Sequence, residues 1–524
     1  MADWHWSDRI NSTAPIANER FACAAAMWGD WLAVLRSGLT DSDGKLYFLE
    51  WTGFGFIHRQ IIDDVEPVLQ TAGAIGNAQG GPQCDMHGDW CVVGLPNYEA
   101  LRGALMVFYN DAGTWKTKPA WLLQASDKAF NDRLGWSVSI WGDTIAGSAH
   151  FRNSSRGAAY IWVRFGEGMD STFSEQDILV PGDIAAGDQF GKSLMLHEHT
   201  LVGGAEFHNH EAQTYPAGAA FIFDRSGGTF GTWSETIELN SPNPGWYDRF
   251  GRGAGIYGDT VVIGAPEMGS YGQAHVFKKN GTWDTDPTQT INGPAPHTRF
   301  GEHVFMHEDL LLIDSPGTDV VQTWTGEVSF YRADEETGLY SLEIPDPIVT
   351  PEESSGSDYF GICTTVWEDR VAFCAQGFDT PYSNTGAVFC LYEWSYNITS
   401  VTPEIISEEG GTEMIASGWF PINKPIEIFM GLNGDPTDKP CYGGEGYGYL
   451  PQTADDSELH FTSPPNAPGL DYKITLRYLE RTFTYSGTVT VLERVWRTKQ
   501  VSTKAGYPSW VGVGKRQLAD EDPR

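Results

Sequence analysis

Through its first three quarters, the chain alternates short apolar runs with two-residue polar turns. In the clearest copy, an apolar run ends at Tyr257, Gly258-Asp259 follows, and a second apolar run covers 260–265. Two such runs joined by a Gly-Asp turn are typical of a tight β-hairpin. The same turn position recurs six more times, at Asp30, Asp89, Asp143, His199, Asp309 and Asp369.

Each copy then continues with two further apolar segments. After a variable loop, a third strand is opened by a glycine, at Gly44, Gly103, Gly157, Gly218, Gly272, Gly326 and Gly386. The fourth strand often begins with threonine and an aromatic residue, as at Thr114-Trp115 and Thr232-Trp233. Successive turns are 50 to 60 residues apart, and a repeat in this range indicates stacked supersecondary units. Four strands in each of seven copies predict an all-β protein with a seven-bladed β-propeller over residues 1–395.

The seventh copy lacks a fourth strand after residue 394. The segment from His5 to Ile10, close to the N-terminus, is similar to the fourth-strand segment from Thr232 to Ile237. An open ring would leave strand edges exposed to pairing with other chains. We therefore expect residues 3–11 to close the ring as the outer strand of blade seven.

From about residue 396 the pattern changes to strands of about five residues separated by Gly and Pro, which predicts a small immunoglobulin-like β-sandwich over 396–492. Residues 493–524 are expected to form an extended basic C-terminal arm. Between 494 and 516 there is no acidic residue. This segment is either a solvated terminus or an assembly tail that lies on an acidic surface of a neighbouring copy or partner. The residues expected to act in assembly are Arg494, Trp496, Arg497, Lys499, Lys504, Trp510, Lys515 and Arg516.

Both predicted domains resemble known families. The Phe250-Gly251 opening, the Gly-Asp turn and the Gly264-Ala265-Pro266 close are similar to FG-GAP repeats, which build the propeller of integrin alpha chains and of many surface proteins. Residues 397–492 resemble the IPT/TIG immunoglobulin-like domain, through Gly410-Gly411-Thr412 and Pro464-Pro465 among other short motifs. That resemblance implies a spacer or interaction module.

The integrin resemblance would also suggest calcium, which needs several oxygen ligands from a long loop. In this chain the corresponding connection is only a two-residue turn, as at Gly142-Asp143. We therefore expect no calcium there. The Asp41-Ser-Asp43-Gly44 sequence lies in a different loop and lacks a distal Glu at the usual spacing, and no paired CxxC suggests zinc. We expect no cofactor.

Composition narrows the range of partners. The chain has 524 residues and a formal net charge of −35, which argues against nucleic acid because phosphate binding needs a basic face. No run approaches 18 apolar residues, so membrane insertion is not expected. The N-terminus shows no signal-peptide pattern, so we expect either that a signal has been removed or that there was none, as in a virion protein.

Seven cysteines and four glycosylation sequons add further expectations. Cys363 and Cys374 flank the turn at Asp369 and could lie within disulfide reach, although small buried thiols are the alternative. The sequons at Asn11, Asn153, Asn280 and Asn397 allow glycosylation of a secreted protein.

The densest titratable segment contains His197, His199, His208, His210 and Glu211. A strand of six residues, roughly 20 Å long, separates the first two histidines from the others, so the two groups are expected on opposite faces of the propeller. His208, His210 and Glu211 could together hold a metal, or they form a solvated polar loop. We find no nucleophile–base arrangement and expect no enzyme; the alternative is a secreted carbohydrate-active lyase or hydrolase on a propeller scaffold.

The variable loops between the second and third strands should project from one face and carry aromatic side chains beside polar ones, which suits a sugar or a peptide. The expected ligand-binding residues are Tyr98, Phe207, His208, His210, Tyr271, Trp324, Asp379 and Tyr382. We therefore expect a non-catalytic binding, adhesion or structural protein on a virion, filament or cell surface. The propeller would bind a glycan or protein ligand, and the sandwich and tail would mediate self-assembly or attachment to another structural protein.

Overall fold

The computed structural model divides the chain into two compact units, Met1–Trp394 and Ser395–Arg524. In the first unit it describes residues 4–7, 9–13, 15, 20–36, 44–52, 55–62, 83–209, 215–294, 299–317, 325–334, 336–344, 358–368, 370–379 and 383–393. In the second unit it describes the strands and no side chains.

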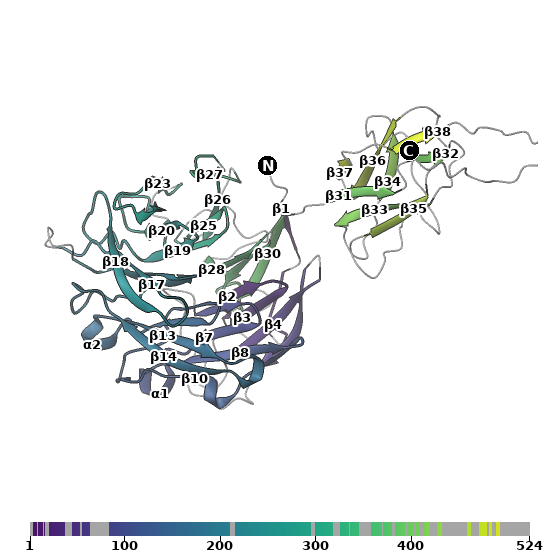
Figure 1. The fold of residues 1–524 in the computed structure, drawn as a ribbon. Helices are drawn as coiled ribbons and strands as arrows, with labels where there is room; N and C mark the ends of the chain where they lie inside the picture. Colours follow the sequence, from purple (N-terminus) through teal and green to yellow (C-terminus); the bar gives the residue numbers. More distant parts are fainter. Residues whose placement is uncertain are drawn as a thin grey trace, which may run out of the picture. The chain divides into compact units, whose positions relative to one another are not determined.

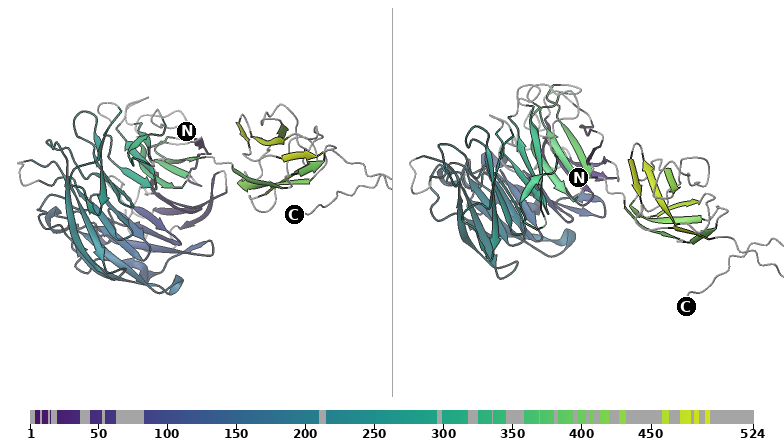
Figure 2. Two further views of the ribbon diagram at one scale, coloured as in Figure 1. Left: turned by 45° about the horizontal axis from the view of Figure 1, so that its top comes forward. Right: turned by 90° about the horizontal axis from the view of Figure 1, so that it is seen from above.

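The described residues of the first unit form seven antiparallel sheets arranged as the blades of a propeller (Figures 1 and 2), which confirms the all-β, seven-bladed prediction. Blade one contains β2 (Phe21–Trp28), β3 (Trp31–Arg36), β4 (Lys45–Trp51) and β5 (Phe56–Ile62). Blade two contains β6 (Cys84–His87), β7 (Trp90–Gly94), β8 (Leu105–Asp111), β9 (Thr114–Lys116) and β10 (Leu122–Leu123). Blade three contains β11 (Val138–Trp141), β12 (Thr144–Ser148), β13 (Ala159–Phe165) and β14 (Thr172–Leu179).

Blades four to six continue the same up-and-down order. Blade four contains β15 (Leu194–His197), β16 (Thr200–Ala205), β17 (Ala219–Ser226) and β18 (Thr232–Asn240). Blade five contains β19 (Gly253–Tyr257), β20 (Thr260–Ala265), β21 (Gln273–Asn280), β22 (Thr282–Trp283) and β23 (Gln289–Asn292). Blade six contains β24 (Val304–His307), β25 (Leu310–Ser315), β26 (Glu327–Ala333) and β27 (Tyr340–Leu342). The first strand of each blade lines the central channel.

Blade seven combines the two ends of the propeller sequence. Its sheet contains β28 (Phe360–Trp367), β29 (Arg370–Ala375), β30 (Ala387–Glu393) and, as the outer strand, the N-terminal β1 (Trp4–Trp6). Strand β1 runs antiparallel to β30, with Trp6 opposite Leu391. The Trp6 ring packs 5.8 Å from the ring of Phe373, so this strand is fixed by side-chain packing as well as by backbone hydrogen bonds.

The repeated glycines and phenylalanines are explained by contacts between neighbouring blades. Gly218, which opens the third strand of blade four, forms a parallel bridge with Phe250 of the next blade. Its φ is +89°, and a Cβ atom at this position would lie 2.1 Å from the Phe250 carbonyl oxygen. Since only glycine fits this approach, the motif is a property of the blade interface. The phenylalanines that precede Gly191, Gly251, Gly301 and Gly361 are fully buried.

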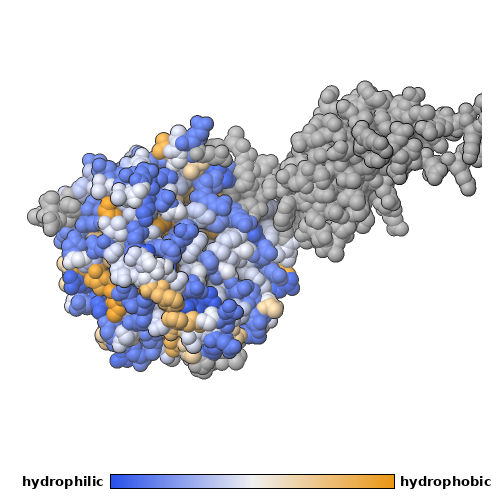
Figure 3. Space-filling model, viewed as in Figure 1, coloured by the Kyte–Doolittle hydropathy of each residue, from blue (hydrophilic) through white to orange (hydrophobic). Residues whose placement is uncertain are grey.

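Helical structure in the first unit is short, with α1 (Tyr98–Leu101), α2 (Arg152–Ser155), η1 (Pro119–Trp121) and η2 (Gly168–Asp170). Among the described residues, no helix is both long enough and apolar enough to cross a membrane. The described surface of the propeller in Figure 3 is mainly hydrophilic, with small apolar patches.

The described strands of the second unit form two sheets. One has the order β31 (Asn397–Thr402), β33 (Glu413–Trp419), β35 (Glu458–Thr462). The other has the order β32 (Ile405–Ser407), β38 (Val489–Leu492), β36 (Asp471–Tyr478), β34 (Glu427–Gly431), and β37 (Arg481–Thr484) also pairs with β36. The expected basic arm, 493–524, lies outside the described residues.

Six cysteines in the described part of the chain are buried thiols, so the disulfide that the sequence allows between Cys363 and Cys374 is not formed in this structure. The β28–β29 ladder is irregular between Phe360 and Thr364. Cys363 lies in that irregularity and is therefore not the direct partner of Cys374 in the ladder. The two thiols still interact, since a hydrogen bond with Cys374 lowers the pKa of Cys363.

Candidate functional site

The loops that join the second and third strands lie on the same face as the segments that lead into the next blade. Around blades four and five the described loops are residues 206–209, 215–218 and 266–272, and the segments that lead into a blade are 180–190 and 241–249. We call this surface the loop face. Backbone hydrogen bonds join neighbouring segments, from Tyr247 N to Pro216 O (2.9 Å) and from Phe207 N to Asp188 O (3.4 Å). The Gly-Asp turns occupy the opposite, turn face.

Four aromatic side chains form a platform on the loop face, comprising Phe207, Tyr215, Trp246 and Tyr247. Trp246 is 71% exposed and Tyr247 is 47% exposed. The Trp246 ring lies nearly parallel to both tyrosine rings, with centroids 6.4 Å from Tyr215 and 5.9 Å from Tyr247. Phe207 meets Tyr247 edge to face at 6.4 Å. Exposed rings held by other rings offer a flat surface on which a sugar or an aromatic side chain can stack.

A buried ion network supports this platform from below. It consists of Lys192, Glu206, Arg252 and Glu302, and Arg252 bridges the two carboxylates at 3.2 Å and 2.5 Å. Arg249 connects the network to the platform, because its guanidinium lies 3.7 Å from Glu206 and 5.6 Å from the centre of the Phe207 ring. The network therefore fixes the position of Phe207.

The network also shifts the pKa values of two of its members, Lys192 and Glu302. Burial lowers the pKa of Lys192 to about 8, although Glu206 opposes this shift. Burial alone would raise the pKa of Glu302, but Arg252 and Arg299 hold that pKa at about 2. The positions of Lys192, Arg252 and Glu302 follow directly from the repeat, since each comes immediately after a Phe-Gly pair.

Beside the platform lies a group that we call the His208 cluster, formed by Asp183, Asp188, His208 and Glu238. His208 is buried, and its Nδ1 donates a hydrogen bond to Asp188 Oδ2 at 2.8 Å. Its Nε2 faces Asp183 Oδ2 at 3.7 Å and Glu238 Oε1 at 3.6 Å. Burial opposes protonation of His208, yet Asp188 raises its pKa. Burial also raises the pKa of Glu238.

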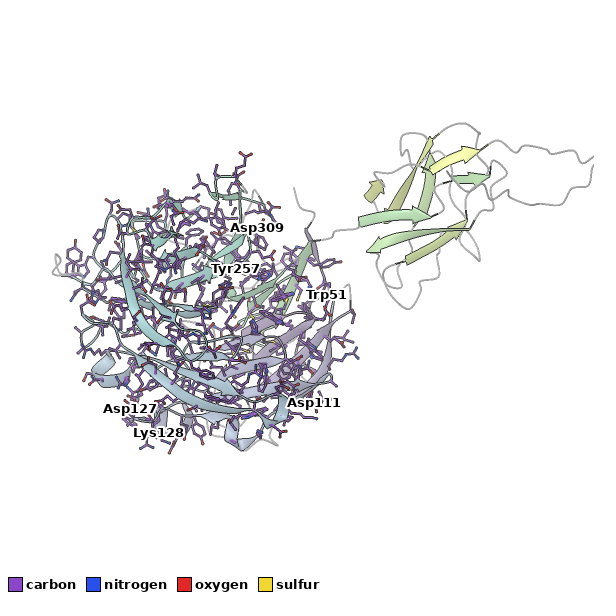
Figure 4. All side chains as sticks on the ribbon, in the orientation of Figure 1. Trp51, Asp111, Asp127, Lys128, Tyr257 and Asp309 are labelled. Carbon is purple, nitrogen blue, oxygen red and sulfur yellow. The ribbon has the colours of Figure 1, made fainter. Side chains whose placement is uncertain are left out.

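On the turn face, seven rings form a closed collar around the channel, one from each blade. Consecutive ring centroids lie between 3.9 and 5.4 Å apart around the whole circle. Figure 4 labels Tyr257, which lies in the interior of the ring of blades, whereas Asp111 and Asp127 lie at its periphery. The collar residues are Trp28, His87, Trp141, His197, Tyr257, His307 and Trp367.

Burial lowers the pKa of the three collar histidines, to about 4 for His87. The collar was missed in the sequence. Its signal was present, because the residue before the two-residue turn is aromatic or histidine in all seven copies.

Of the residues expected to bind ligand, Phe207 and His208 come together in this site. Tyr98 instead packs against the core of the first blades. Tyr271 is exposed on the loop of blade five, and the Asp379 carboxylate accepts a hydrogen bond from Asn384 N in blade seven. His210, Trp324, Tyr382 and Glu211 lie outside the described residues.

The structure also places the sequons. Asn153 and Asn280 have exposed side chains. Asn11 is half-buried, and its Oδ1 atom is buried without a hydrogen bond. Asn397 lies in β31 of the second unit.

Comparisons with known proteins agree with this architecture. The FG-GAP repeat family matches residues 122–162 and 173–223. The chain is therefore a seven-bladed β-propeller protein that contains FG-GAP repeats, as its resemblance implied. No curated protein matched the chain.

Three solved structures are similar in part. A structure from a study of two prolyl endopeptidases has 12% identity and a TM-score of 0.36, over 74% of this chain and 49% of that one. This chain thus spans about half the length of that protein. A neuraminidase-like protein of influenza A/flat-faced bat/Peru/033/2010 (H18N11) has 13% identity and a TM-score of 0.32, over 68% and 96%. The hemagglutinin-neuraminidase of parainfluenza virus 5 has 8% identity and a TM-score of 0.31, over 67% and 95%.

Proposed function

We propose that this chain is a non-catalytic binding protein whose loop face, at blades four and five, recognises a glycan or protein ligand. The observation that carries the proposal is the aromatic platform, in which Trp246 is 71% exposed and lies nearly parallel to the rings of Tyr215 and Tyr247. Single exposed aromatic side chains are common, as Phe130 shows at 71%, but a contiguous group of them marks an interaction site. The neighbouring carboxylates and Arg249 supply the polar groups that orient a ligand.

The remaining parts of the proposal concern attachment. The second unit, with its resemblance to IPT/TIG immunoglobulin-like domains, would serve with the basic arm as the module for assembly, on a virion, filament or cell surface. The net charge of −35 supports protein or glycan partners over nucleic acid, and it supplies acidic surface for a basic arm to contact.

A glycan array, with a parallel pull-down of surface proteins, tests the recognition head. Trp246→Ala should weaken binding by at least about tenfold, as expected for truncation of a central aromatic anchor. Phe230→Ala is the matched control, because Phe230 is 63% exposed and stacks on Phe165 between the third and fourth strands, away from the loop face. Equal binding by the wild type and the Trp246 variant would refute the assignment of the platform. Binding to proteins alone would identify the ligand class as protein.

A further inference from the structure

We propose that the His208 cluster is a binding site for one divalent transition-metal ion, with Zn²⁺ as the representative ion, held by His208 Nε2, Asp183 and Glu238. These three groups come from three different segments of blade four and its boundary with blade three. One donor atom from each lies within 4.8 Å of the other two. Metal binding by this cluster would be a second role, in addition to the stacking of a ligand on the aromatic platform.

The spacing of the donor atoms matches a metal's requirement better than that of a hydrogen-bonded group. His208 Nε2 is 3.6 Å from Glu238 Oε1 and 3.7 Å from Asp183 Oδ2. Both distances are too long for hydrogen bonds. Zinc bonds of about 2.0–2.2 Å in tetrahedral geometry place neighbouring donors roughly 3.3–3.5 Å apart. Small shifts of the side chains would therefore bring His208 Nε2 and each carboxylate oxygen to this spacing, with one position left for a fourth ligand.

The orientation of the imidazole is fixed from the other side. Nδ1 donates its hydrogen to Asp188 Oδ2 at 2.8 Å, and Asp188 Oδ2 in turn accepts a hydrogen bond from Ala185 N at 2.8 Å. A ligating histidine usually has such a carboxylate partner, which selects the tautomer with a free lone pair on the metal side. On that side Glu238 Oε1 is buried and makes no hydrogen bond. An orphaned carboxylate oxygen of this kind is costly unless a cation satisfies it.

Blade three provides a comparison within the same molecule. There Asp127, five residues before Asp132, corresponds to Asp183, five residues before Asp188. Asp127 accepts hydrogen bonds from Arg152 Nη2 at 2.5 Å and from the Tyr160 hydroxyl at 2.6 Å. Its negative charge is therefore satisfied by protein groups alone.

Blade four replaces each of those partners. Arg152 and His208 are equivalent positions, because each lies nine residues after the turn residue of its blade, Asp143 or His199. Tyr160 is paired with Ile178 across its sheet, whereas Phe221 is paired with Glu238. Blade four has thus lost a guanidinium and a hydroxyl and gained an imidazole and a second carboxylate. The positive charge supplied by Arg152 in blade three must come from another source in blade four.

The ligand set selects the ion. One imidazole and two carboxylates suit zinc and similar first-row ions. Calcium takes six to eight oxygen ligands, which this cluster does not provide. The Asp183 side chain is 41% exposed, so the remaining coordination position opens towards the loop face. A metal here would lie beside Phe207 and could contact a ligand bound on the platform.

Isothermal titration of the full-length, tag-free protein with Zn²⁺ tests the proposal. We expect a site with one Zn²⁺ per chain, abolished by Glu238→Gln and by Asp183→Asn. Asp188→Asn should weaken it by about 10–100-fold, as for loss of a group that orients a ligand. Asp127→Asn, in the equivalent loop of blade three, is the matched control and should leave binding unchanged. Ca²⁺ should not compete for the site.

Cobalt provides a second measurement, since a bound Co²⁺ ion reports its nitrogen and oxygen ligands through its visible absorption. The spectrum should appear in the wild type and disappear in Glu238→Gln, while circular dichroism of the two proteins stays the same. The proposal is overturned if the wild type binds no Zn²⁺, or if Zn²⁺ binds equally well to Glu238→Gln. In that case His208 would be an imidazolium that bridges three carboxylates without any metal.

Discussion

Replacement of Arg252 by methionine should destabilise the propeller strongly, because Arg252 is the link between two buried carboxylates. Arg252, Glu206 and Glu302 are all buried, with at most 5% of their surface exposed. The guanidinium donates to Glu302 Oε1 at 2.5 and 2.8 Å and to Glu206 Oε1 at 3.2 Å. Methionine retains most of the volume and removes the charge. Loss of one partner from a buried ion pair costs about 3–5 kcal/mol.

The titration of Glu302 gives an independent magnitude. Its pKa falls from 4.5 to about 2 in the folded protein, with burial opposing the shift and Arg252 as the largest favourable cause. At about 1.4 kcal/mol for each pKa unit, the fall from 4.5 to about 2 corresponds to about 3–4 kcal/mol. Because the folded pKa lies below the unfolded one, this stability is present above about pH 4.5 and is lost as the pH falls towards 2. The two magnitudes agree.

Urea unfolding followed by tryptophan fluorescence would measure the effect at pH 7 and again at pH 3. We expect Arg252→Met to lose about 3–5 kcal/mol at pH 7 and to lose less between pH 7 and pH 3 than the wild type does. The control is Arg59→Gln, whose partner is Glu50 at 2.5 Å with both side chains largely exposed (48% and 35%); such a pair contributes less than about 1 kcal/mol. A loss of under 1 kcal/mol in Arg252→Met would refute the reasoning.

Two further predictions concern the blade interface and the collar. Gly264→Ala should lower the melting temperature by several degrees more than Gly258→Ala. A Cβ at Gly264 would lie 2.0 Å from the Gly301 carbonyl oxygen, whereas one at Gly258 has no neighbour within 4 Å and costs only the backbone strain of a φ of +54°; equal melting temperatures would contradict this. Acid should destabilise the collar, because the pKa of His87 is lowered to about 4 by burial, so stability falls as the pH drops from about 6.5 to 4. His87→Phe should reduce this pH dependence in thermal unfolding, and an unchanged dependence would argue against the collar as its source.

The architecture could be predicted because its signal is local and repeated. The turn at Gly258-Asp259 and the glycine at Gly218 each specify one short piece of backbone, and seven copies make the period visible. The structure adds the physical reason, which is the approach of Gly218 to Phe250 of the next blade. This contact joins residues that are 32 positions apart in the sequence. Because the same contact recurs in several blades, its two residues appear as a repeated motif.

The His208 cluster could not be assembled in the same way. Asp183 and Glu238 are 25 and 30 residues from His208, and neither belongs to a motif that recurs in all blades. Sequence reasoning grouped His208 with His210 and Glu211 because they are adjacent. Strand β16 does separate His197 from His208, but the partners of His208 depend on the register of β17 against β18, which places Glu238 opposite Phe221. That register is a tertiary property.

The two ends of the channel explain why recognition is assigned to the loop face and not to the axis of the propeller. The collar encircles the channel at the turn face with rings in mutual contact, and the cavity that it lines has a volume of ≈ 110 Å³, enough for a few water molecules. At the other end Arg252 and Glu302 are buried and bonded to each other. A ligand larger than this cavity would have to displace the collar rings or break the buried ion pair. The platform at Trp246 requires no such rearrangement. It lies beside the His208 cluster, where the residues of blade four differ from the equivalent residues of blade three.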